Sequence, residues 1–449
     1  MSKYLIVGII LVVLVALLAT NKKLVETLKN IYKIEELRKR ILFTLGLLLV
    51  YRLGSFVTLP GVNHAALEAF TQSFADDNSL MGLLNVFSGG AFSQASIFAL
   101  GVMPYITASI IIQLMGIMVP YFRKMQREGE SGRRKMNQWT RFLTIGVLML
   151  QAPAYLKTMV MRGDVIAMGE STFIYTSTLI LIAGTMFIMW LGEKITDRGI
   201  GNGISLIIMI GIVARLPQAF LQEFMFKLEG SAGSIIMLIV ELVLLAMVFM
   251  LAIAIVQAVR KIPVQYAKRI VGNKQYGGVR QYIPLKLNAA NVMPIIFAQA
   301  LMFIPGLIWG GQWLDIQSFW YNFTLFALVI AFTYFYTAII VNPQMMADDM
   351  KRNGGFIPGV KPGKSTVTYI DNIMTRITLP GSIFLAIITV LPAIAMTIGI
   401  SQGFAYFFGG TSLLIMVGVV LDTLKQIESY LLMRHYDGLM KTGRIQGRY

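Results

Sequence analysis

The chain has 449 residues, of which 56% are hydrophobic and 14% charged, whereas soluble domains usually contain about 25% charged residues. This composition excludes an ordinary water-soluble globular protein, yet 39 Lys and Arg against 22 Asp and Glu give a formal net charge of +17. The chain has no cysteine and two histidines, which excludes disulfide frameworks, thiolate nucleophiles and zinc or iron–sulfur sites built from Cys or clustered His.

The chain begins with an apolar segment, residues 1–20, whose place in the protein is open. Its apolar run, 4–19, resembles a signal-anchor but is short for a membrane span, which needs about 20 residues. It is either an extra helix with its N-terminus outside or a stretch foreign to the native protein. Residues 21–40 then predict an amphipathic cytoplasmic helix, because apolar residues recur at intervals of three and four.

Ten long apolar runs predict an all-α polytopic membrane protein with ten spanning helices. The runs are 41–60, 95–119, 142–156, 173–192, 204–221, 234–258, 290–309, 323–342, 373–396 and 404–422.

The basic residues predict the orientation of these helices. Six connections, among them 21–40 and the tail 423–449, hold 33 Lys and Arg and 12 acidic residues. The alternate five connections hold 4 basic and 8 acidic residues. Because basic loops are retained in the cytoplasm, both ends of the ten-helix body are expected there.

Residues 79–93 are semi-apolar, too short and too polar to span, and broken by Gly89 and Gly90. We expect a half-helix or re-entrant piece on the outer side, which is tolerated at membrane depth only where protein surrounds it. Further along, residues 197–205 follow the pattern G-x-G-x-G rather than G-x-G-x-x-G, and no strand precedes them. They predict a cap for the helix that begins near Ile204, and not a nucleotide site.

Two cytoplasmic connections have distinctive turns. In 260–288, the β-prone stretches 262–270 and 279–285 flank glycine-rich turn residues, which predicts a raised hairpin. Its cations either only fix topology or bind an acidic protein or RNA phosphates. In 348–364, Gly-Gly and Pro-Gly pairs predict a non-helical tip with spaced cations, which suggests a docking surface.

Ionisable residues are scarce within the apolar runs. Arg52 and Glu241 are the two candidates for intramembrane charge, and Glu241 is interpreted as a paired or interfacial residue. This scarcity disfavours an ion-coupled transporter.

Eight stretches, read in order, resemble the SecY family of bacterial protein translocase subunits, over residues 22–449. They are FSGGAFSQASIFALGVMPYITASIIIQL (87–114), EGESGRRK (128–135), GTMFIMWLGEKITDRGIGNGIS (184–205), PVQYAKR (263–269), PLKLNAANVMPIIFA (284–298), GGFIPGVKPGK (354–364), YIDNIMTRITL (369–379) and FGGTSLLI (408–415).

The resemblance implies two pseudo-symmetric halves around an hourglass pore, 41–221 with helices 1–5 and 233–422 with helices 6–10, joined by a hinge connection at 222–232. It also implies a ring of aliphatic side chains at the waist, which would close the pore by dewetting. The ring maps onto Val102, Ile106, Ile204, Ile208, Ile296 and Ile415. Val102 departs from the usual isoleucine, which should widen or soften the ring. Without the motifs, these residues would be read as ordinary packing.

By the same resemblance, residues 79–93 correspond to a plug beneath the ring. Its core is Phe87, Ser88, Gly89, Gly90, Ala91, Phe92 and Ser93. A lateral gate, through which apolar segments would reach lipid, involves Thr107, Gln113 and Asn288.

The resemblance further implies that the ribosome, through its RNA and proteins, or the SecA motor ATPase docks on the basic loops. The docking residues are Arg260, Lys261, Lys268, Arg269, Lys274, Arg280, Lys351, Arg352, Lys361 and Lys364. The family commonly has arginine at Lys361, so charge is kept while the bidentate fork is lost. SecE and SecG, signal peptides, unfolded precursor polypeptides and membrane lipid are the other expected partners.

The sequence therefore predicts a protein-conducting channel of the bacterial cytoplasmic (inner) membrane that is not an enzyme and has no cofactor. A small-solute transporter, the first rival, would need a polar or charged midplane site. An intramembrane enzyme, the second, would need a catalytic cluster that the sequence does not suggest.

Overall fold

The computed structural model describes residues 34–63, 67, 85, 88–160, 166, 169–229, 233–266, 269–271, 274–276, 280–290, 292–309 and 315–441. The predicted segment 1–20 and most of the predicted helix 21–40 lie outside them. The chain divides into two compact units. The first comprises Met1–Leu53, Met189–Ile207 and Val419–Tyr449, and the second comprises Gly54–Ile188 and Ile208–Gly418.

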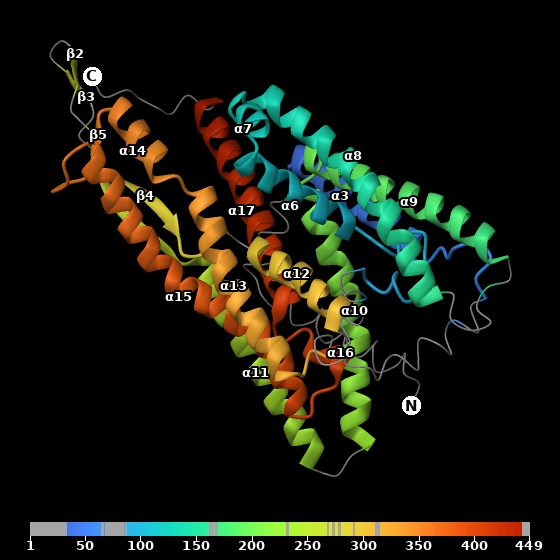
Figure 1. Cartoon of the computed structure of the whole chain (residues 1–449). Coiled ribbons are helices and arrows are strands. Elements are labelled where there is room, and N and C mark those ends of the chain that lie inside the picture. Colours follow the sequence, from blue (N-terminus) through green and yellow to red (C-terminus); the bar gives the residue numbers. More distant parts are fainter. Residues whose placement is uncertain are drawn as a thin grey trace. The chain divides into compact units, whose positions relative to one another are not determined.

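A helix lies on each of the ten predicted runs, which confirms the all-α class (Figure 1). These helices are α3 (Glu35–Gly54), α6 (Met103–Met118), α8 (Glu130–Tyr155), α9 (Glu170–Arg198), α10 (Gly203–Glu229), α11 (Gly233–Gln257), α12 (Met293–Trp309), α13 (Phe319–Ile340), α15 (Lys364–Thr397) and α17 (Gly410–Lys441). Within the described residues, 6 of the helices are long and apolar enough to cross a membrane, or up to 7 if a bent pair is one span. That pair is α6 followed by α7 (Pro120–Arg127), which are bent by 100°.

Several helices extend beyond the apolar runs that predicted them. α3 begins at Glu35 and joins the predicted amphipathic helix to the first span, while α17 continues through the predicted tail to Lys441. α10 continues to Glu229, so the described part of the predicted connection 222–232 is helical. The reason is that Lys, Arg, Glu and Gln end a hydropathy run although they favour helix nearly as well as leucine does.

In the first unit, the glycine loop 199–202 is held by side chains from α3 and α17. Thr44 Oγ1 accepts a hydrogen bond from the Ile200 amide at 3.1 Å, and Gln426 Oε1 accepts one from the Gly201 amide at 2.8 Å. Asn202 Oδ1 accepts from the Ser205 amide at 3.3 Å at the start of α10. The predicted cap for this helix is therefore confirmed.

In the second unit, α6 packs on α8, and α13 packs on both α12 and α15. A buried apolar cluster at the end of α8 includes Leu59, Ala95, Tyr155, Phe173 and Leu181. η1 (Leu156–Val160), a π-helical turn, continues α8 past its proline and adds Leu156 and Val160 to this cluster. The cluster fixes the chain that follows the glycine segment 88–93.

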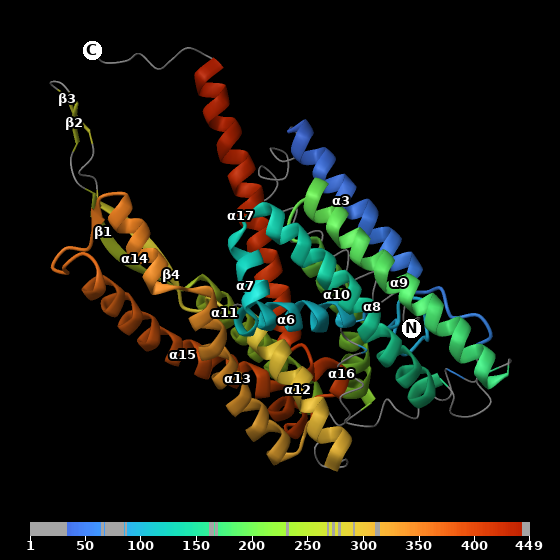
Figure 2. The ribbon, with the colours of Figure 1, turned by 45° about the horizontal axis from the view of Figure 1, so that its top comes forward.

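The predicted hairpin is present in the second unit. β1 (Val259–Tyr266) pairs antiparallel with β4 (Arg280–Lys286) and with β5 (Gly355–Phe356), in the order β4-β1-β5. β2 (Arg269–Val271) and β3 (Lys274–Tyr276) form a second ladder beyond it (Figure 2).

The predicted non-helical tip 348–364 is partly wrong. Residues 348–352 belong to α14 (Pro343–Arg352), because Asn342 caps this helix by accepting from the Gln344 and Met345 amides. The remainder up to Gly363 is non-helical, as the glycines and prolines predicted.

Candidate functional site

The glycine segment 88–93 is a compact turn that its own polar groups organise. The Gly90 amide donates to the Asn85 carbonyl at 2.9 Å, and the Ser93 amide donates to Asn85 Oδ1 at 3.2 Å. Gly89 and Gly90 have φ of 65° and 96°, a region that favours glycine, so the predicted break in this segment is confirmed.

Side chains from two helices, α8 and α10, hold this segment. Tyr155 of α8 donates its hydroxyl proton to the Phe92 carbonyl at 2.7 Å, and the two rings are 4.8 Å apart. Arg215 of α10 donates from Nη2 to Ser93 Oγ at 3.3 Å. A Cβ at Gly90 would lie 2.7 Å from the same Nη2. Ser88, Gly89, Gly90 and Ala91 are buried, so protein surrounds the segment as predicted. Phe87 and residues 79–84 lie outside the described part.

The predicted ring residues lie on or next to four helices, α6, α10, α12 and α17. Val102, at the N-cap of α6, and Ile415, in α17, are buried, whereas Ile106, Ile208 and Ile296 are half-buried. Ile204, in the first turn of α10, lies against Gly192 of α9, because a Cβ at that glycine would come within 2.8 Å of its side chain. The assembly of these six residues into a ring stays a prediction.

The predicted gate residues have local or incomplete polar contacts. Thr107 donates to the Met103 carbonyl at 3.1 Å, and Gln113 donates to Ser109 Oγ at 3.4 Å, both within α6. Asn288 is 6% exposed and its Oδ1 accepts no hydrogen bond from the described residues.

The two predicted docking loops form one body. The β1–β5 pairing joins them, and a shared apolar cluster lies beneath, with Ile262, Val264, Leu285, Met350 and Ile370 among its members. The predicted docking cations that this body exposes are Arg260, Lys261, Lys351, Arg352, Lys361 and Lys364. Arg269, Lys274 and Arg280 lie on the strands β2, β3 and β4, and Lys268 lies outside the described residues.

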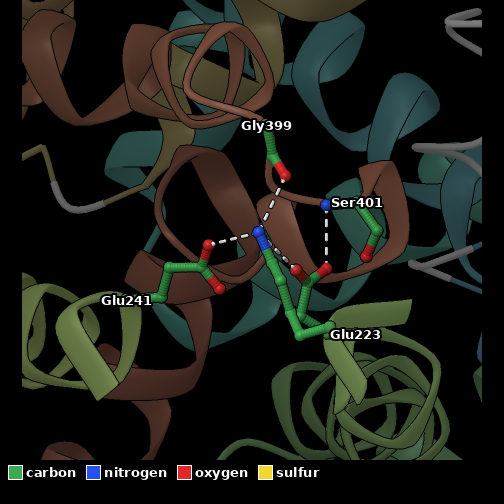
Figure 3. A network of polar contacts seen from close by, with 5 residues as sticks. Glu223, Glu241, Gly399 and Ser401 are labelled. Carbon is green, nitrogen blue, oxygen red and sulfur yellow. Dashed lines mark hydrogen bonds and ion pairs between the residues drawn. The ribbon is translucent and has the colours of Figure 1, made fainter. Parts of the chain in front are cut away.

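A buried ionic network that we did not predict lies at the end of α10 (Figure 3). Lys227 Nζ lies 2.9 Å from Glu241 Oε1 of α11, 3.5 Å from Glu223 Oε1 and 3.1 Å from the Gly399 carbonyl, to which it donates. Glu223 Oε2 accepts from the Ser401 amide at 2.8 Å. Both carboxylates are 0% exposed, so each depends on this ammonium for its compensating charge. The interpretation of Glu241 as a paired residue is confirmed.

Lys227 was missed because the predicted fifth span ended at residue 221, which placed it in the following connection. Arg215 lies within the run 204–221 but was counted with the basic residues of that connection. The available signal was the spacing of Glu223 and Lys227, which are four residues apart and therefore neighbours on a helix. Among the described residues, no group of three or more His, Cys, Asp or Glu is placed to hold a metal ion.

The fold and these contacts define a class: a many-span helical membrane protein that encloses a short glycine-rich segment and carries a raised basic hairpin. The comparisons with known proteins are consistent with that class. The family model described as SecY matches residues 96–424. The chain belongs to the SecY family.

The chain is 42% identical over 439 residues to the protein translocase subunit SecY of Streptomyces scabiei, covering 91% of this chain and 98% of that protein. It is 40% identical over 456 residues to the corresponding subunit of Chlamydia trachomatis, covering 94% and 99%. A solved structure described as a protein conducting channel superposes with a TM-score of 0.61 at 17% identity, covering 87% of this chain and 91% of that one. The Sec61 channel in a canine ribosome-channel complex gives 0.57 at 15% identity, covering 87% and 91%.

Proposed function

We propose that this chain is the channel-forming subunit of a protein translocase, which passes unfolded polypeptides outward across the cytoplasmic membrane and releases apolar segments sideways into lipid. The observation that carries the proposal is its 42% identity to named translocase subunits along 91% of its length. The chain serves as a conduit rather than an enzyme, so a partner such as the SecA motor or the ribosome supplies the energy.

In this proposal the six aliphatic residues form the seal at the waist. The seal is Val102, Ile106, Ile204, Ile208, Ile296 and Ile415. Apolar constrictions block ions by dewetting and still fit around a chain of any sequence. Residues 79–93 form the plug beneath them. A related SecY protein has a solved structure whose description states that its plug domain stabilises the closed state and maintains a membrane seal.

The proposed channel opens in two directions, outward across the membrane and sideways into lipid. The two halves, 41–221 and 233–422, move about the α10–α11 connection, and the gate residues Thr107, Gln113 and Asn288 line the lateral exit. The proposal is supported by their placement, because Thr107 and Gln113 lie on α6 in the first half and Asn288 lies between β4 and α12 in the second, so both halves can contribute polar side chains to the exit.

The basic body formed by β1, β4, β5 and α14 is the proposed cytoplasmic dock, with both ends of the ten-helix body on the same side. The lopsided charge count supports this orientation. A yeast Ssh1 complex of similar fold is described as bound to the 80S ribosome, with a TM-score of 0.57. SecE and SecG are the proposed companion subunits.

The channel is tested by placing a photocrosslinker at Ile208 and arresting a secretory precursor in transit. We expect a crosslink between this residue and the precursor. A crosslinker at Leu150, which is 79% exposed on α8, is the matched control and should label lipid. A complex that moves a small solute and never crosslinks its precursor at residue 208 contradicts the proposal.

The dock is tested by replacing Lys351, Arg352, Lys361 and Lys364 with alanine together. We expect weaker ribosome binding whose salt dependence is reduced, because counterion release scales with the number of phosphate contacts. Exchanging Lys361 for arginine keeps the charge and should preserve binding. Unchanged affinity and salt dependence in the alanine variant would remove this surface from the dock.

A further inference from the structure

Arg215 is a charged residue in the interior of a membrane span. It lies in the middle of the apolar helix Gly203–Leu228, and its side chain is half-buried. Charged residues at such depth are costly, face the protein interior and mark functional contacts. Its guanidinium reaches the glycine segment 88–93, because Nη2 donates to the hydroxyl of Ser93 at 3.3 Å.

The glycine segment is built to receive this guanidinium. Ser93 donates its own hydroxyl proton to the Gly90 carbonyl at 3.1 Å, which leaves its oxygen lone pairs directed outward to accept from Arg215. Gly90 lacks a side chain at the point where a Cβ would lie 2.7 Å from Nη2. The close approach therefore requires glycine at residue 90, in addition to the requirement set by its φ of 96°.

We propose that Arg215 is a positioning residue that latches the plug in its seated state. The proposal rests on the assignment of residues 79–93 as the plug, and it uses only the described part, 88–93. Tyr155 anchors Phe92 from α8, and Arg215 holds the neighbouring Ser93 from α10. When the plug leaves, the Ser93 hydroxyl and the guanidinium exchange their contact for water, so the latch restrains the segment without locking it.

The chain has no cysteine, so one introduced thiol reports plug movement without background. Ala91 is 1% exposed, and an Ala91→Cys variant in the full complex in proteoliposomes should react slowly with a maleimide. We expect Arg215→Ala to raise its labelling rate roughly tenfold, which is near the lower limit for the loss of one charge-assisted hydrogen bond. Gln218→Ala changes an exposed residue of the same helix and is the matched control.

A second variant removes the same contact from its other side, which keeps the test valid if Arg215→Ala misfolds. Ser93→Ala removes the acceptor without altering α10, and it should raise labelling in the same direction. Combined with Arg215→Ala its effect should be less than additive, because both changes break the contact between Arg215 and Ser93. If Arg215→Ala labels within about twofold of the Gln218→Ala control, the range of an ordinary surface substitution, Arg215 is not a latch.

The test separates the latch from the channel itself. Ile106→Gly combined with Ile296→Gly should raise ion leak through the proposed waist, whatever Arg215 does. Unchanged labelling together with this leak overturns the latch alone. Raised labelling without any leak in the double-glycine variant keeps the latch and contradicts the waist seal.

Discussion

Two cations on α10 bind other parts of the chain, one through buried ion pairs and the other through a hydrogen bond to a neutral hydroxyl. Lys227, near the helix end, is 8% exposed and lies among two carboxylates and a carbonyl. Arg215, near the helix middle, is half-buried and contacts the neutral hydroxyl of Ser93. The first contact joins α10 to α11 and to the turn after α15, while the second joins α10 to the glycine segment.

The difference lies in what remains when the cation is gone. Without Lys227, Glu223 and Glu241 are two buried charges with no compensation, which is among the most destabilising states in a folded protein. Without Arg215, the Ser93 side chain that it contacts is a neutral hydroxyl, which leaves no buried charge behind at that contact. A buried ion network therefore fixes geometry, whereas a half-buried bond to a neutral acceptor suits a part that moves.

The largest expected effect comes from breaking the fixed contact. Lys227→Met should lower the free energy of unfolding by about 3–5 kcal/mol, because it leaves both carboxylates unpaired. Thermal unfolding of the purified protein measures this loss. Lys157→Met, at an exposed lysine of η1, is the matched control and should change little.

Removing both carboxylates as well tests whether unpaired charge causes the loss of stability in Lys227→Met. Glu223→Gln and Glu241→Gln, added to Lys227→Met, should recover most of the lost stability, since neutral groups replace the buried ions. If the triple variant unfolds as early as Lys227→Met alone, lost packing and not unpaired charge is responsible.

A smaller effect is expected from a change at Gly90, the residue that the Arg215 guanidinium approaches. Gly90→Ala places a Cβ against the Arg215 guanidinium and forces a side chain into a φ of 96°, which costs about 1–2 kcal/mol. Hydrogen exchange at the amides of Gly90, Phe92 and Ser93 should accelerate.

In an Arg215→Ala background the steric part of this cost disappears and the backbone part remains. The effect of Gly90→Ala should therefore shrink there without vanishing. An equal effect in both backgrounds would show that the guanidinium does not approach residue 90.

The ten helices could be predicted because long, predominantly apolar runs leave few alternatives in a membrane. The ends of α3, α10 and α17 could not, because hydropathy measures the cost of placing a residue in lipid and not its tendency to be helical. This is why Lys227 was counted as a connection charge rather than recognised as part of a buried network.

The residues that contact the predicted ones were even harder to predict from the sequence. Ser93 and Arg215 are 122 positions apart, and the pattern of either region alone gives no sign of the other. The two basic loops were predicted separately because β5, which joins them, has 2 residues and leaves no periodicity to detect. Glu241, by contrast, is a charge within an apolar run and was interpreted on that ground as paired or interfacial. Its contact with Lys227 shows that the first alternative is correct.

The smallest expected effect tests whether the glycine segment has two independent attachments. Tyr155→Phe removes the hydroxyl that donates to the Phe92 carbonyl and keeps the ring contact, so the segment should lose about 1 kcal/mol of local stability. Hydrogen exchange across 88–93 should rise less than it does for Gly90→Ala. Because Tyr155 and Arg215 hold different residues from different helices, the effects of Tyr155→Phe and Arg215→Ala should add. A combined effect no larger than either single one would mean that the two side chains act through one shared contact, and the segment would then be released in a single step.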